Sequence, residues 1–346
     1  MRKEDDMINK NMIVLAREAR GITQLELAEK IGVANTTVSK MEKGDLNTSD
    51  EAIALIAEAT NFPVSFFSQE NDIYPEHLNY RKRDSVAQKL LTPLNANVNI
   101  VRLHIQRLLS DLNIKKSDLP SFEVNEKNTP AIIAKKIRKV WKVDSAIIDN
   151  IVELLESKGI VVTSFDFGTE RVDSRCVLTD NKHPIIIYNN TLLGDRQRFS
   201  LAFQLGHLVM HTSTSVDWER DVAHEANLFA SEFLMPEAVI RGDFDNGVTL
   251  PLLGELKRKW KVSMISLLYR ADDLGYLTPN QKRYLLQQFN EQKMRRREPK
   301  ELDVPIEREK LVKKWIKELK TKQKLNDKGV ASLFHLNMDE FTARYN

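Results

Sequence analysis

The chain has 346 residues, which is long enough for two or more domains that each bury a core. Hydrophobic residues make up 42% of the chain and charged residues 29%, proportions that are typical of a soluble globular protein and exclude a largely disordered one. The formal net charge is only +3, so nucleic-acid binding cannot be inferred from global charge and requires a local motif.

The cysteine content and the hydrophobic segments bear on the compartment. Cys176 is the single cysteine, which excludes an intramolecular disulfide and fits a reducing environment. Residues 1–12 lack the apolar core of a signal peptide, and no stretch approaches the roughly 18 uninterrupted apolar residues that span a bilayer. We therefore expect a cytoplasmic protein that does not associate with membranes.

Helical patterns dominate the first part of the chain. Residues 12–68 contain short helical patterns separated by glycine, with apolar residues three and four positions apart. Residues 70–84 are polar and irregular, and predict a linker or a short strand. Helical periodicity returns over 85–113 and, as two shorter helices, over 130–158.

The middle of the chain changes character. Segments that are rich in β-branched residues and bounded by turn-forming residues predict a small sheet, at 159–167, 175–180 and 183–190. Helical patterns resume after it, at 194–211, 219–234 and 250–292. The sequence therefore predicts an α+β fold that is mostly helical.

Two short helices joined by a tight turn are predicted between Thr23 and Gly44. Such a pair is the minimal device that places one helix in the major groove of DNA. Thr23 can cap a first helix that runs from 24 to 31, and Gly32 supplies the conformation that the turn needs. The second helix begins near residue 35 or 36 and ends at Gly44. The residues expected on the buried side of the first helix are Leu25, Leu27, Ala28 and Ile31, and those expected to anchor the second are Val33, Val38 and Met41.

The second helix would present short polar side chains that can pair with base edges and phosphates. The expected DNA-contacting residues are Gln24, Asn35, Thr36, Thr37, Ser39, Lys40 and Lys43. Residues 1–50 contain 8 Lys or Arg and 9 Asp or Glu, so affinity would depend on the local placement of Arg17, Lys40 and Lys43. Because phosphate neutralisation would be modest, tight binding would require a two-fold dimer.

This stretch resembles the XRE (Cro/cI-type) helix-turn-helix family from about residue 12 to 68. The matching positions are Thr23, Gln24, Leu27, Ala28, Gly32, Val33, Val38, Ser39, Glu42 and Gly44. The alternative is a plain helical bundle, which would not need this density of matches around one turn. The resemblance implies a five-helix domain that binds double-stranded operator DNA as a homodimer.

A second diagnostic region comprises residues 198–211 and 224–236. In zinc peptidases, a helix with the pattern His-Glu-x-x-His grips the metal with two histidines, and its glutamate polarises the attacking water. Both segments resemble the ImmA/IrrE family of metallopeptidases, and a looser likeness extends from about 145 to 275, which implies a zincin-like fold. The matching positions are Arg198, Phe199, Leu201, Ala202, Leu205, Gly206, His207, Leu208, Val209 and His211, then Ala226, Asn227, Phe229, Ala230, Leu234, Met235 and Pro236.

The departures from the family pattern affect the metal site itself. Phe203 replaces the first histidine and has no lone pair for a metal. Gln204 replaces the glutamate, and its amide cannot act as a base near neutral pH. The third ligand position falls on Ala223, although Glu225 stays open as a substitute, and His207 alone clearly survives from the ligand set. We therefore expect no catalytic residue and no metal cofactor.

Another metal site is an alternative. His207 and His211 are four residues apart, and Asp217, His224 and Glu225 are near in sequence. These residues could rebuild a metal site, or His211 could be a family feature that serves packing or hydrogen bonding. The charge runs at 293–300 and 313–324 are likewise open to two interpretations, since they fit solvated helix faces or a second nucleic-acid contact.

The two resemblances together predict a transcriptional regulator with a catalytically inactive peptidase-like domain. That domain would sense a small molecule or peptide, hold a protein partner, or serve only dimerisation and scaffolding. Other hypotheses are an antitoxin-like protein that binds DNA and a toxin, an active zinc endopeptidase that cleaves a repressor, and an interaction module with vestigial DNA binding. The expected domains are a helix-turn-helix domain at 8–70, a helical connector at 71–143, an ImmA/IrrE-like domain at 144–280 and a charged helical extension at 281–346.

Overall fold

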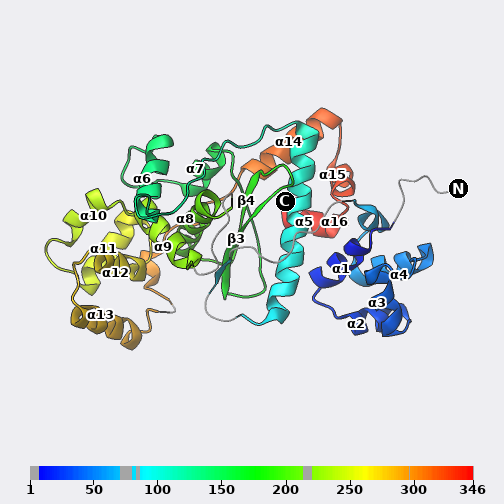
Figure 1. Ribbon diagram of the computed structural model, residues 1–346, viewed down its shortest axis with the longest axis horizontal. Coiled ribbons are helices and arrows are strands. Elements are labelled where there is room, and N and C mark those ends of the chain that lie inside the picture. The colour runs from blue at the N-terminus through cyan, green and yellow to red at the C-terminus, as the bar shows by residue number, and fades with distance from the viewer. Residues whose placement is uncertain (1–7, 71–79, 83–85, 213–219, 296, 346) are drawn as a thin grey trace.

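The computed structural model describes residues 8–70, 80–82, 86–212, 220–295 and 297–345. Figure 1 shows an extended arrangement, with the first four helices at one end, α10 to α13 at the other, and a sheet between them. Helices predominate around this single described sheet, which confirms the mostly helical α+β class. Within the described residues, no helix is both long and apolar enough to cross a membrane.

Four α-helices form the described N-terminal domain, and the second and third of them have the predicted boundaries. They are α1 (Lys10–Ala19), α2 (Gln24–Ile31), α3 (Asn35–Lys43) and α4 (Asp50–Thr60). Thr23 caps α2 through a reciprocal pair of hydrogen bonds with Glu26, and Gly32 takes the left-handed conformation at φ 71°. The expected fifth helix is instead a 3₁₀ turn, η2 (Val64–Ser68), which follows Pro63 directly.

One predicted core residue of α2 is exposed. Leu25 was expected on the buried side of the helix, but 55% of its surface is accessible to solvent. Leu27, Ala28 and Ile31 are buried and share one side of α2. Because each residue turns an α-helix by about 100°, Leu25 lies about a third of a turn away from the centre of that side.

The sheet has two buried faces. Its strands are β1 (Tyr80–Lys82), β2 (Val161–Phe165), β3 (Val172–Leu178) and β4 (Pro184–Asn189), in the order β1-β3-β4-β2. β3 pairs antiparallel with β1 and β4, whereas β2 runs parallel to β4. Val161 and Ile185 belong to the core on the side of the long helix α5 (Gln88–Leu112), and Val162 and Ile186 belong to the opposite core. This alternation follows from the two-residue period of a strand.

The core on the face of the sheet opposite α5 is built by a second group of helices. They are α6 (Pro130–Val140), α7 (Ile151–Ser157), α8 (Gly194–Met210), α9 (Val222–Leu234), α10 (Glu237–Phe244), α11 (Leu250–Trp260), α12 (Met264–Asp273) and α13 (Pro279–Glu291). α8 lies between the sheet and α9 and is buried on almost every side. A side chain at Gly206 would bring its Cβ within 3.0 Å of the Phe229 ring, so this glycine allows α8 and α9 to approach closely.

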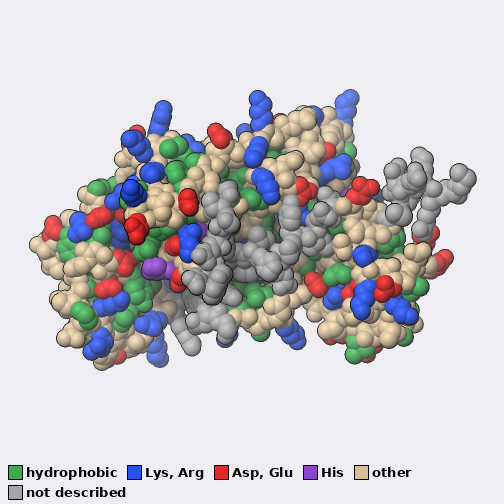
Figure 2. Space-filling view, viewed as in Figure 1, with side chains coloured by type: hydrophobic (Ala, Val, Ile, Leu, Met, Phe, Trp, Pro, Cys, Tyr) green, Lys and Arg blue, Asp and Glu red, His purple; other side chains and the backbone are tan. Residues whose placement is uncertain are grey.

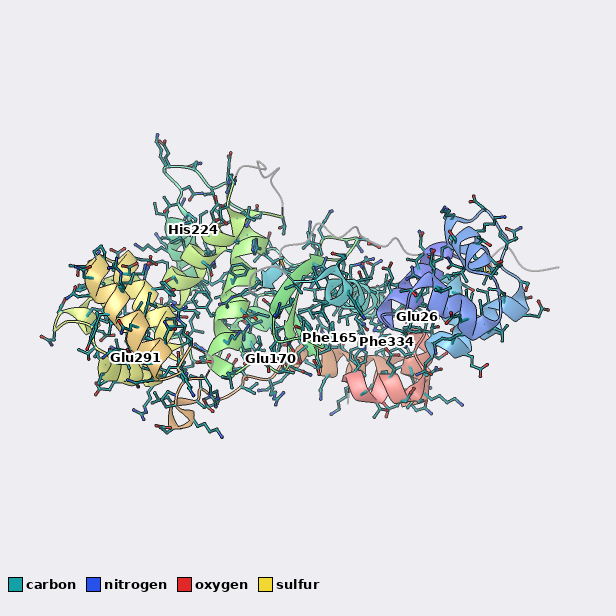
Figure 3. The ribbon with its side chains drawn as sticks, turned by 90° about the horizontal axis from the view of Figure 1, so that it is seen from below. Glu26, Phe165, Glu170, His224, Glu291 and Phe334 are labelled. Atoms are coloured by element: carbon teal, nitrogen blue, oxygen red, sulfur yellow. The ribbon has the colours of Figure 1, made fainter. Side chains whose placement is uncertain are left out.

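The C-terminal segment returns along the molecule to the N-terminal helices (Figure 1). It contains η3 (Lys300–Leu302), α14 (Leu311–Gln323), α15 (Asp327–Leu333) and α16 (Met338–Tyr345). α14 packs on α5 and β2 through Trp315 and neighbouring apolar residues, while Lys313, Lys314 and Lys317 are exposed. Figure 3 shows these last helices beside the N-terminal ones.

Candidate functional sites

Helix α3 carries an accessible polar surface. Asn35, Thr36, Lys40 and Lys43 are exposed, whereas Thr37 and Ser39 are partly exposed. Val38 and Met41 face the domain core, so the periodicity of the helix directs the polar residues outward. This is the side-chain type that reads base edges and contacts phosphates.

An ion pair braces the helix pair from inside. Both Arg17 nitrogens Nε and Nη2 donate to Glu42, at 2.6 and 3.1 Å, and Gln24 Nε2 donates to Glu42 Oε2 at 2.6 Å. Arg17 is therefore committed to Glu42, contrary to its expected availability for phosphate. Figure 2 shows cationic and anionic side chains side by side over the N-terminal helices, in agreement with their balanced charge count.

The positions that correspond to the zinc site lie at a cleft. Phe203 on α8 and Ala223 on α9 both line a hollow of about 560 Å³. The cleft is also bordered by Ser263 and Ser266 at the start of α12 and by Met294, Arg295, Arg297 and Glu298. Phe203 and Ala223 therefore lie at one cleft, although 20 positions separate them (223 − 203).

Gln204 lies beneath the cleft rather than at its surface. It is 0% exposed, and its Nε2 donates to Ser174 Oγ at 3.0 Å. Its Oε1 has no hydrogen-bond partner among the described residues. A neutral amide in this position can orient a neighbour, but it cannot remove a proton from water near neutral pH.

His207 begins a buried chain of hydrogen bonds. Its Nδ1 lies 2.8 Å from His211 Nδ1, and His211 Nε2 lies 2.8 Å from Glu225 Oε2. Arg220 in turn donates to both oxygens of Glu225. Burial, with a smaller effect from His211, lowers the pKa of His207 to about 3, so its ring is neutral at physiological pH. Glu225, the residue that stayed open as a substitute zinc ligand, therefore has its carboxylate bound by His211 and Arg220.

The donor set does not fit catalytic zinc. Catalytic zinc sites use three protein ligands around an open position. Among the positions that correspond to the ligands of the family pattern, His207 Nε2 is the one suitable donor, and it is buried without a partner within the described part of the chain. Phe203 and Ala223 have no donor atom. No group of three or more His, Cys, Asp or Glu residues within the described ranges could hold a metal ion.

The remaining candidates for a rebuilt site lie elsewhere. His224 is exposed in the first turn of α9, where Figure 3 labels it. Asp217 lies outside the described residues. Cys176 is buried in β3, and burial raises the pKa of its thiol to about 12. This thiol is therefore protonated and packed among apolar neighbours.

Arg81 is among the cleft residues that sequence reasoning missed. This residue of β1 lines the cleft, and its Nη1 donates to Ser200 Oγ on α8 at 3.0 Å. The segment around Arg81 is polar and irregular, so its sequence carries no signal for a contact with a helix 119 positions away. This contact depends on the pairing of β1 with β3, which is a tertiary feature.

The fold and these two sites define a helix-turn-helix protein that also carries a metallopeptidase-like domain. Comparison with protein families identifies the family that each of these two domains matches. The family described as "Helix-turn-helix" matches residues 13–67, and the "IrrE N-terminal-like domain" matches residues 155–272. These matches confirm the resemblances to the XRE and ImmA/IrrE families. No curated protein matches the chain.

Proposed function

We propose that this chain is a cytoplasmic, sequence-specific transcriptional regulator that binds operator DNA as a homodimer. The observation that carries the proposal is the accessible polar surface of α3, held on a domain of the helix-turn-helix family. In such domains the second helix of the pair enters the major groove, and its outward residues contact the bases. The position of Asn35, Thr36, Thr37 and Ser39 on α3 supports base contacts by these residues, and the exposed Lys40 supports a phosphate contact.

The peptidase-like domain is catalytically inactive in this proposal. Phe203 and Gln204 remove one zinc ligand and the general base together. The cleft that they leave accepts a ligand or a partner instead of cleaving one. The same proposal divides the chain into domains at 8–70, 71–143, 144–280 and 281–346. The last segment runs from the peptidase-like domain back to the helix-turn-helix domain.

The DNA-binding proposal is tested by gel shift with the fragment upstream of the chain's own gene. The intact protein is expected to retard this fragment, and Thr37→Ala and Lys40→Ala are expected to weaken the complex. Lys139→Ala changes an exposed cation on α6 and serves as the control. Equal retardation by all four proteins, or no retardation, would contradict the proposal.

The inactive-domain proposal is tested by metal analysis of protein purified without added zinc. Substoichiometric zinc and no chelator-sensitive proteolysis are expected. One tightly held zinc per chain, together with proteolysis that a chelator abolishes, would favour the zinc endopeptidase instead.

A further inference from the structure

An arginine covers the position where the metallopeptidase pattern has its first histidine. Arg81 belongs to β1, one of the two edge strands of the described sheet, where it lies opposite Ser174 of β3. Its guanidinium carbon is 4.4 Å from the ring centre of Phe199 and 5.6 Å from that of Phe203. Both distances are within the range of a cation–π interaction.

Polar groups also surround this guanidinium. Arg81 Nη1 donates to Ser200 Oγ at 3.0 Å, and its Nε lies 3.8 Å from Asp173 Oδ2. Asp173 is 3% exposed and also pairs with Arg196, which fixes its position. Two ring faces, a hydroxyl and a buried carboxylate together match a planar cation that carries several N–H donors.

The replacement at residue 203 and the presence of an arginine are chemically consistent. A divalent metal held at this position would repel the guanidinium, whereas an aromatic face attracts it. We propose that Phe203, Phe199, Asp173 and Ser200 form a guanidinium-binding site and that Arg81 occupies it. The former ligand position thus fastens β1 to α8.

The occupied site connects the cleft with the DNA-binding end. β1 lies in the chain between η2 of the helix-turn-helix domain and α5. A ligand that carries a guanidinium, such as an arginine side chain of a peptide, competes with Arg81 and releases β1. This step rests on the ligand-sensing part of the proposed function and names the ligand class.

Hydrogen–deuterium exchange of the full chain tests the intramolecular contact. Arg81→Ala is expected to speed amide exchange in 80–82 and 172–175 about tenfold, because the strand loses its fastening. Phe203→Leu is expected to act in the same direction, since it keeps an apolar side chain and removes the ring. Exchange in α14 reports whether either variant disturbs the fold in general.

Arg241→Ala is the matched control. Arg241 on α10 also combines a carboxylate partner, Glu237, with an aromatic ring, Tyr276 at 5.8 Å, but it is remote from β1 in sequence. This variant is expected to leave exchange in β1 unchanged. Equal exchange in wild type, Arg81→Ala and Arg241→Ala would overturn the proposed site.

A small guanidinium compound tests the guanidinium-binding site and the ligand-sensing step separately. N-acetylarginine amide is expected to bind the Arg81→Ala protein. The matched lysine compound, N-acetyllysine amide, is expected not to bind it. In the wild type, N-acetylarginine amide at saturating concentration is expected to speed exchange in β1. Binding to the variant without release of β1 in the wild type would keep the guanidinium site and overturn the ligand-sensing step. No binding to the variant would overturn the site.

Discussion

Arg20 and Glu340, at opposite ends of the chain, form an ion pair in which Arg20 Nη2 lies 2.5 Å from Glu340 Oε2. Arg20 Nε also donates to the Thr60 carbonyl at 2.6 Å, and its guanidinium lies over the Phe62 ring. Asp339, the neighbour of Glu340, accepts from Asn61 Nδ2 at 3.2 Å. The last helix, α16, therefore contacts the helix-turn-helix domain, although the two lie at opposite ends of the sequence.

Removal of this ion pair should weaken the attachment of α16. Glu340→Ala leaves a partly buried guanidinium without its carboxylate, so we expect the free energy of unfolding to fall by about 1–2 kcal/mol. Urea denaturation measures the change. Glu318→Ala removes an exposed acid from α14 and is expected to leave the midpoint unchanged. An equal effect of the two substitutions would contradict the stabilising role of the ion pair.

The same interface predicts a pH dependence. His104 on α5 stacks on Phe334, and its Nδ1 lies 2.7 Å from the Tyr345 hydroxyl. Burial first, then the charges of Arg344 and His335, lowers the pKa of His104 well below 6.5. The unfolded chain therefore binds a proton before the folded chain does, so this contribution is complete above about pH 6.5 and is lost as the pH falls toward the folded pKa.

His104→Gln tests this contribution. The substitution removes one titrating group, so the decline of unfolding free energy below pH 6.5 should become shallower by at most about 1.4 kcal/mol per pH unit. Urea denaturation at several pH values measures the slope. His224→Gln changes an exposed histidine of α9 and should keep the wild-type slope. A wild-type slope in His104→Gln would disprove the assignment.

Lys40 should contribute through phosphate rather than through base recognition. Its exposed position late in α3 places an ammonium where it can meet the DNA backbone. Lys40→Ala should weaken binding to all duplexes alike and reduce the slope of log K against log salt by about 0.9. Titrations at several salt concentrations give this slope. An unchanged slope would exclude a phosphate contact.

The residues at the zinc-ligand positions of the family pattern make a zinc-binding variant testable. His207 Nε2 is unpartnered within the described residues, and His211 orients the ring through Nδ1, as an outer partner of a metal-bound histidine does. The triple replacement Phe203→His, Gln204→Glu and Ala223→Glu should therefore take up about one zinc per chain.

Metal analysis after dialysis against zinc checks this uptake. His207→Ala in the triple variant is the control, since it should abolish the uptake by removing the surviving ligand. Zinc content at the wild-type level in the triple variant would show that α8 and α9 no longer hold the positions in a ligating arrangement.

Local signals predicted much of the DNA-binding domain. Thr23, Gly32 and Gly44 mark the ends of α2 and α3 through capping and left-handed turns, which depend on neighbours in sequence. Leu25 was misjudged because the apolar stripe of a short helix is narrow. The expected fifth helix is the short 3₁₀ helix Val64–Ser68, a difference that the periodicity of so short a segment could not predict.

The cleft could be predicted in part. The sequence located Phe203, Gln204 and Ala223 by their register with a family pattern. It could not reveal that Arg81 covers Phe203, because β1 has three residues and its place depends on pairing with a distant strand. The ion pair between Arg20 and Glu340 was equally invisible, since the return of the C-terminal segment leaves no periodic signal.

Sequence-specific DNA binding is tested most directly by the ratio of the dissociation constants of the intact protein for two duplexes. A duplex selected by the protein from a random pool is titrated beside a scrambled duplex of equal length at physiological salt. We predict a dissociation constant of about 10⁻⁸ M or lower for the selected duplex and at least about a thousandfold weaker binding to the scrambled one. Equal affinity for the two duplexes would contradict sequence-specific reading by α3.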